Sequence, residues 1–163
     1  MIEVKNILKS FENSDVLKEI ETIFYRGKTN LIIGQSGSGK TVLLKCLLGL
    51  YEVDSGEIIY DGVSSKKMNS DEKLDISRQM GMVFQGSALF DSMNVLENVR
   101  FPLDMLTKID ENEKNSRAMK FIERVNLKDA INKLPSELSG GMQKRVAIAR
   151  AIVMNPKYLF CDE

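Results

Sequence analysis

The sequence predicts an α/β fold with a largely parallel core sheet, and three observations lead to this prediction. Short segments rich in β-branched residues at the N-terminus are typical of paired strands. The apolar segment Thr29–Gly34 passes through a glycine-rich turn into an apolar helix. Beyond that helix, predicted strands and helices alternate, as they do in layered α/β proteins.

The first third of the chain is expected to contribute most of the strands. Ile2–Phe11 and Ile20–Lys28 are predicted to form an antiparallel pair around the turn-prone letters ENSD. Thr29–Gly34 is continuously apolar at its centre, so we expect a strand buried on both faces. The helix that follows is expected to end near Gly49, and Gly56–Gly62 is expected to form a strand between two glycine turns.

The rest of the chain is expected to be mostly helical. Ser70–Gln79 begins with a serine N-cap signal and acids in the first turn, and Gly81–Gln85 is a candidate buried strand. Two later helices are indicated by apolar residues at helical spacing: Ala118, Phe121, Ile122 and Val125 in the first, and Met142, Val146, Ala149 and Val153 in the second. Pro156 ends the second helix, and Lys157–Glu163 returns as a strand.

Composition narrows the class of protein. The 163 residues, 43% of them hydrophobic, suffice for one globular domain with a sizeable core. Lys and Arg together number 23, as do Asp and Glu, so the basic excess typical of nucleic-acid binding is missing. No apolar stretch approaches the roughly 20 residues that cross a bilayer, and a soluble, cytoplasmic chain is predicted. Cys46 and Cys161 lie in apolar runs and are expected to be buried free thiols.

The segment Gly34–Thr41, GQSGSGKT, matches the phosphate-loop pattern in full and lies between a predicted strand and a predicted helix. Glycines let successive backbone N–H groups converge on phosphate oxygens, and the helix start adds its positive dipole end. The residues expected to bind the nucleotide are Gly34, Ser36, Gly37, Ser38, Gly39, Lys40, Thr41 and Val42. Among them, Lys40 is expected to bridge the β- and γ-phosphates, and the Thr41 hydroxyl to ligate Mg²⁺. The alternative is a glycine-rich turn with a surface lysine.

Two further stretches carry candidate site residues. YLFCDE ends in two acids, of which Asp162 is expected to complete the Mg²⁺ shell and Glu163 to orient or deprotonate water. The alternative for either acid is a solvated strand end. In LSGGM, Ser139 as N-cap and the exposed N–H groups of Gly140 and Gly141 make a second anion-binding helix start. The alternative there is a flexible loop before a capped helix.

With these motifs in this order, the whole chain resembles the ATP-binding subunits of ABC transporters. The resemblance implies a P-loop nucleoside triphosphatase core over 1–163, with a helical subdomain at about 86–153, and ATP and Mg²⁺ as cofactors. It also implies that Gln85 is a catalytic residue and Mg²⁺ ligand and that Phe11 stacks on adenine, unless Phe11 is an ordinary strand residue. In the implied head-to-tail homodimer, Ser139 and Gly141 contact the γ-phosphate held by the other subunit.

A finer resemblance concerns the transported substrate. Met82–Leu103 and the stretch LPSELSGGMQKRVAIARAI are similar to the ATPases of Mla-type phospholipid importers. This implies membrane permease partners, an MCE-domain lipid-binding protein, and a place on the inner face of the cytoplasmic membrane. Leu89, Phe90 and Met93 would anchor the permease, or else pack inside the domain. Importers or exporters of amino acids or lipoproteins stay open, as does a soluble ABC protein acting on DNA or ribosomes.

Members of this family continue beyond the second acidic motif, with an aspartate loop and then a histidine that contacts the γ-phosphate. The chain contains no histidine. We therefore interpret it as a fragment that lacks the C-terminal part of the fold and hydrolyses ATP negligibly by itself. The resemblance further implies a missing strand between the strands of NLIIG and YLFCD.

Overall fold

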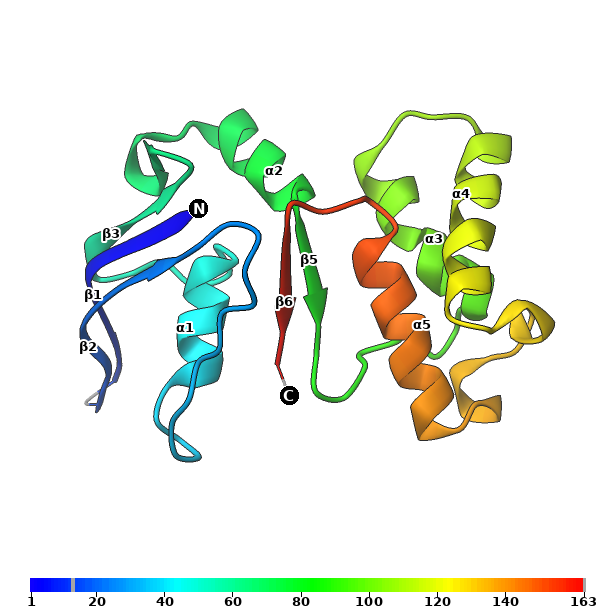
Figure 1. Ribbon diagram of the computed structural model, residues 1–163, viewed down its shortest axis with the longest axis horizontal. Coiled ribbons are helices and arrows are strands. Elements are labelled where there is room, and N and C mark those ends of the chain that lie inside the picture. Colours follow the sequence, from blue (N-terminus) through cyan, green and yellow to red (C-terminus); the bar gives the residue numbers. More distant parts are fainter. Residues whose placement is uncertain (13, 163) are drawn as a thin grey trace. The chain divides into compact units, whose positions relative to one another are not determined.

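The computed structural model describes residues 1–12 and 14–162 (Figure 1). The chain divides into two compact units, Met1–Ser77 and Arg78–Glu163, each with its own sheet and helices. Each unit is described by itself below.

The sheet of the first unit is antiparallel and has the strand order β2-β1-β3-β4. Strand β1 (Ile2–Phe11) pairs with β2 (Ser14–Phe24) and with β3 (Ser55–Tyr60), and β3 turns into the short edge strand β4 (Val63–Ser64). The predicted strand between two glycine turns is confirmed. The predicted strand pair is also found, but its second strand covers Ser14–Phe24 and not Ile20–Lys28. The apolar face of this sheet is buried and includes Ile2, Val4, Ile7, Leu17, Ile58 and Tyr60.

Helix α1 (Lys40–Leu47) packs beside this sheet, as Figure 1 shows. Its buried side chains are Leu43, Leu44, Cys46 and Leu47, and Gly49 follows its end with a φ of 71°, as expected for a helix that stops there. Burial raises the pKa of the Cys46 thiol, so the predicted buried free cysteine is confirmed at this position.

The predicted buried strand at Thr29–Gly34 is wrong for this structure. These residues belong to neither sheet, and the side chains of Leu31 and Ile33 are 79% and 85% exposed. The Asn30 side chain instead holds this segment: it accepts the Tyr25 N–H and donates to the Tyr25 carbonyl. An apolar run forms a strand only where another strand pairs with it, and none does so within the described residues.

Short helical segments lead to the end of the first unit. A 3₁₀ turn (Ser65–Lys67) precedes α2 (Ser70–Arg78). The predicted helix is confirmed, but Asn69 rather than Ser70 caps it. The Asn69 side chain accepts the Glu72 N–H at 2.9 Å, and the Glu72 carboxylate accepts the Asn69 N–H at 2.8 Å. This reciprocal pair is a capping box.

The second unit has a two-stranded parallel sheet of β5 (Met80–Val83) and β6 (Tyr158–Cys161). Gly81 lies against the end of helix α5, because a Cβ added there would be only 2.3 Å from the Ala151 carbonyl oxygen. Cys161 is exposed, contrary to the prediction of a second buried thiol. Alternate residues of β6, Leu159 among them, face away from the unit's core, and a continuous apolar run does not show which of its sides is covered.

Three helices surround one core in the second unit (Figure 1): α3 (Val95–Leu106), α4 (Glu111–Arg124) and α5 (Gly140–Ile152). Two 3₁₀ turns, Lys128–Ala130 and Pro135–Glu137, connect α4 to α5. The predicted stripes on α4 and α5 are confirmed as core-facing. The core contains Val95, Val99, Leu103, Ala118, Phe121, Ile122, Val146, Ala149 and Val153. No helix among the described residues is long and apolar enough to cross a membrane.

Candidate functional site

The phosphate loop is an exposed turn that folds back on itself before α1. Gly37 and Gly39 have φ values of 79° and 93°, which favour glycine. Gly34 is also constrained, because a Cβ there would lie 2.6 Å from the Ser38 Oγ atom. These three positions account for the glycines of the motif.

The first turn of α1 carries the charged and hydroxyl groups of the loop. The Lys40 ammonium donates to the carbonyl oxygens of Gly34 at 2.8 Å and Gln35 at 2.9 Å, so it lies across the loop. The first helical bond runs from the Leu43 N–H to the Gly39 carbonyl at 2.8 Å. The N–H groups that precede it, including that of Val42, belong to the helix start, where anions bind.

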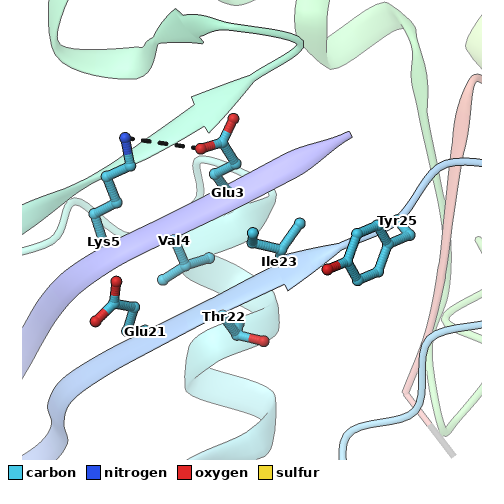
Figure 2. Close-up of a pocket in the computed structure, with 7 residues that line it drawn as sticks. All are labelled: Glu3, Val4, Lys5, Glu21, Thr22, Ile23 and Tyr25. Atoms are coloured by element: carbon cyan, nitrogen blue, oxygen red, sulfur yellow. Dashed lines mark ion pairs between the residues drawn. The ribbon is translucent and has the colours of Figure 1, made fainter.

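Two hollows lie in the first unit. One of about 290 Å³ borders the loop and is lined by Ser38, Gly39 and Lys40 and by apolar side chains, among them Leu17 and Leu43. The other, about 420 Å³ and drawn in Figure 2, lies over β1 and β2. Its lining contains none of the predicted site residues: Glu3, Val4, Lys5, Glu21, Thr22, Ile23 and Tyr25. We therefore place the candidate site at the loop and not in the larger hollow.

Phe11, the predicted adenine contact, ends β1 and is 39% exposed. Its ring packs edge-on against Tyr51, with the centroids 5.3 Å apart. The Lys9 ammonium lies 5.3 Å from the Phe11 centroid and also contacts Asp54 at 2.7 Å. Hydrogen bonds from Lys9 and from the Ser10 N–H lower the pKa of Asp54. Sequence reasoning missed Tyr51, because no motif includes it.

Gln85 and Asp162 lie in the second unit, where the structure brings both to one edge of the parallel sheet. They follow β5 and β6, and the Asp162 N–H extends the ladder by donating to the Val83 carbonyl at 3.0 Å. Thr41 belongs to the first unit. Glu163 lies outside the described residues. Within those residues no three His, Cys, Asp or Glu side chains form a cluster suited to a metal. Within the second unit, the Gln85 amide and the Asp162 carboxylate offer oxygen donors of the kind that Mg²⁺ takes.

The second predicted helix start is capped as expected. The Ser139 Oγ atom accepts the Met142 N–H at 3.3 Å. Gly140 and Gly141 are exposed, and no heavy atom lies within 4 Å of a Cβ built on either residue. The turn before the helix is held by the Gln143 amide, which donates to the Pro135 carbonyl at 2.9 Å. Among the described residues of the second unit, none packs against a Cβ built on either glycine, apart from the glycine's chain neighbours and its own helix backbone.

The segment after Gln85 is held by two residues that sequence reasoning did not single out. Arg150 of α5 donates to the carbonyls of Ser87 at 2.9 Å and Ala88 at 2.8 Å. Asn98 of α3 is fully buried. Its side chain accepts the Phe90 N–H and donates to the carbonyls of Phe90, Met93 and Asn94.

The three residues proposed as permease anchors differ in how far they are buried. Leu89 packs against the helical core, and Met93 is partly buried. Phe90 is 40% exposed and rests on Phe101, with ring centroids 4.6 Å apart.

Comparison with known protein families matches residues 17–163 to the family described as "ABC transporter". The chain belongs to the ABC transporter family. Methionine import ATP-binding protein MetN of Clostridium acetobutylicum is 40% identical over the whole chain, which covers 51% of that protein. A probable ribonucleotide transport ATP-binding protein, mkl, of Mycobacterium leprae is 39% identical over 99% of the chain, which covers 47% of it. The chain thus spans about half the length of the curated relatives it matches.

Among solved structures, the ATP-binding cassette MJ0796 in a dimeric post-hydrolysis state with ADP and Pi matches with a TM-score of 0.90. It is 32% identical, and the match covers 100% of this chain and 74% of that one. The fold is that of the ABC ATPase cassettes, α/β with an antiparallel N-terminal sheet and a helical part. Cassettes of this family bind ATP with Mg²⁺ as the usual partner, and the exposed glycine-rich loop with the Lys40 ammonium across it fits a triphosphate.

Proposed function

We propose that this chain is the ATP-binding and ATP-hydrolysing part of a subunit that powers an ABC transporter. The observation that carries the proposal is that this chain, a member of the family, has two helices that begin in glycine-rich segments, at Lys40 and at Gly140. Both helix starts suit a phosphate group. A purely nucleotide-binding module needs one such helix start. Two of them suit a protein that closes around the γ-phosphate from both sides.

In this proposal the loop residues orient the triphosphate. Lys40 exchanges the Gly34 and Gln35 carbonyls for oxygens of the β- and γ-phosphates, which as anions bind an ammonium more strongly. Thr41, Gln85 and Asp162 would hold Mg²⁺, which when bound supplies positive charge beside the γ-phosphate. Glu163 orients or deprotonates the attacking water, and Gln85 is the second catalytic residue.

The proposed assembly is a head-to-tail homodimer. Ser139, Gly140 and Gly141 would contact the γ-phosphate on the other subunit. The open surroundings of the two glycines support this role, because no described residue of the second unit requires glycine there. The dimeric state of MJ0796 supports the pairing of two such subunits.

The partners and place of the subunit are also proposals. The three-helix part, at about 86–153, would be the helical subdomain, and its exposed Phe90 would meet membrane permease subunits on the inner face of the cytoplasmic membrane. Of the three predicted anchors, Phe90 has the strongest support because Leu89 is engaged with the helical core.

For the transported substrate, we keep phospholipid as the first candidate, with an MCE-domain protein as a further partner. It rests on the resemblance of Met82–Leu103 and of the stretch around Ser139. Amino-acid import is the second candidate, favoured by the 40% identity to a methionine import protein. Co-purification of the subunit with its permease distinguishes them: an MCE-domain partner favours lipid, and a small-molecule-binding partner favours an amino acid.

The phosphate loop can be tested by Lys40→Ala in the full-length subunit. We expect this change to abolish tight ATP binding in calorimetry, because one charge-assisted contact to two phosphates is lost. Lys66→Ala, at an exposed position outside the loop, is the matched control and should bind ATP like the wild type. Phosphate release should be lost together with binding. ATP affinity that survives Lys40→Ala would overturn the proposal.

A further inference from the structure

Tyr51 is the residue that positions the ring of Phe11. It lies in the loop after α1, and its N–H donates at 3.2 Å to the Lys45 carbonyl, which also accepts the Leu50 N–H at 2.9 Å. Its ring meets Phe11 at an interplanar angle of 66°, the edge-on arrangement that aromatic pairs favour. The last turn of α1 therefore fixes the loop, and the loop fixes the edge of the Phe11 ring.

A charged pair holds Phe11 from another side. The Lys9 side chain is only 15% exposed, and its ammonium lies near the Phe11 ring. Asp54 holds this ammonium with one carboxylate oxygen and accepts the Ser10 N–H at 2.7 Å with the other. The Asp54 N–H in turn donates to the Leu8 carbonyl at 2.9 Å. Lys9 is therefore not free to swing away from the ring.

The Phe11 ring is connected to the phosphate loop through packed residues of the first unit. Leu17 of β2 is the ladder partner of Lys9, and a Cβ on Gly39 would lie 3.2 Å from the Leu17 side chain. On the other side, the Lys45 ammonium lies 5.2 Å from the Tyr51 centroid, on the same helix as Lys40. The ring pair and the loop are thus parts of one packed structure.

We propose that Tyr51 is a positioning residue of the nucleotide site, which holds Phe11 in the orientation that stacks on the base. The inference rests on the proposed function, in which Phe11 contacts adenine. It goes further by assigning the fixed orientation of that ring to Tyr51, with the Lys9–Asp54 pair as a second support. A ring held in place before binding loses less freedom when the base arrives, so the base contributes more to affinity.

The experiment measures the contribution of the base to the binding affinity separately from that of the phosphates. Calorimetry on the full-length subunit measures the affinity for ATP and for inorganic tripolyphosphate, both with Mg²⁺. Tyr51→Leu should weaken ATP binding about two- to tenfold, the usual worth of an aromatic pair, and leave tripolyphosphate binding unchanged. Tyr51→Phe keeps the ring and should retain wild-type ATP affinity. Tyr25→Leu removes a 60% exposed tyrosine at the other end of the sheet and should change neither affinity.

The results that would contradict the inference differ from those that would contradict the proposed function. Unchanged ATP affinity in Tyr51→Leu overturns the inference, as does an equal loss for both ligands, which would mean that Tyr51 only supports the fold. Should Tyr51→Leu not fold, Lys9→Met removes the second support of the Phe11 ring and must show the same ATP-specific loss. A wild-type subunit that binds neither ligand, or that binds both after Lys40→Ala, overturns the proposed function and the inference with it.

Discussion

Gly81 and Gly141 lie in different surroundings, and we expect alanine at these two positions to change stability in different ways. Gly81→Ala must displace the Ala151 carbonyl or the strand, since the added Cβ would lie 2.3 Å from that oxygen. We expect a loss of roughly 1–3 kcal/mol in the free energy of unfolding, as for other overpacked sites. Gly141→Ala is the matched control, because its surroundings are open. It should leave stability unchanged or raise it by up to about 1 kcal/mol, because alanine is the better helix former.

Urea unfolding of the two variants measures both effects. Equal stability of Gly81→Ala and the wild type would contradict the packing of α5 against β5.

For single residues, the sequence predicts the role of those that belong to a short motif with fixed spacing. Lys40 and Ser139 could be assigned because each belongs to a short pattern with one chemical purpose. Tyr51 and Arg150 could not, because their contacts lie far away in sequence: 62 and 63 residues separate Arg150 from the carbonyls it holds. Only the fold brings such partners together. Asn98 contacts residues only four to eight positions away, but it belongs to no motif.

Among the α-helices, α3 is the one that the sequence analysis does not predict. Its signal was present: Asn94 and Glu97 form a capping box, three residues apart, at its start. Pro102 lies inside the helix and argues against a helix in the sequence, since proline normally ends one. The opposite error occurred at Thr29–Gly34, where apolar residues indicated a strand that has no partner here.

The contact between α5 and the segment after Gln85 can be tested by Arg150→Lys. The guanidinium reaches two carbonyls at once, whereas an ammonium is a single point charge. Ser87 and Ala88 both have left-handed φ values, of 64° and 46°, which are costly for residues other than glycine. We therefore expect faster amide hydrogen exchange at Ser87 and Ala88 in the lysine variant.

The N–H groups at the start of α4, on another element of the same unit, should exchange at the wild-type rate and serve as the internal reference. Exchange at Ser87 and Ala88 that is no faster than in the wild type would mean that Arg150 does not hold this segment.

For the whole molecule, the solvent exposure of Leu31 and Ile33 can be tested in polypeptide 1–163. Side chains that are already in water contribute little to stability, so Leu31→Ala combined with Ile33→Ala should leave the free energy of unfolding nearly unchanged. The same change should reduce binding of a dye that recognises exposed apolar surface. Ile7→Ala, at a fully buried position, is the control and should cost about 2–5 kcal/mol. A similar loss in the double variant would show that these side chains are covered in solution.

The open space over Gly140 and Gly141 has a consequence for how damage in this protein would be recognised. A Cβ added at either position would meet no described residue outside its own helix and chain neighbours, so we expect alanine copies to fold, accumulate and resist degradation like normal ones. Screens that rank substitutions by abundance or melting temperature would score them as harmless. In the proposed two-subunit assembly such copies would still pair with intact ones and spoil the shared site. A cell carrying both forms would then lose more transport than the fraction of altered copies suggests, which is the behaviour of a dominant-negative allele.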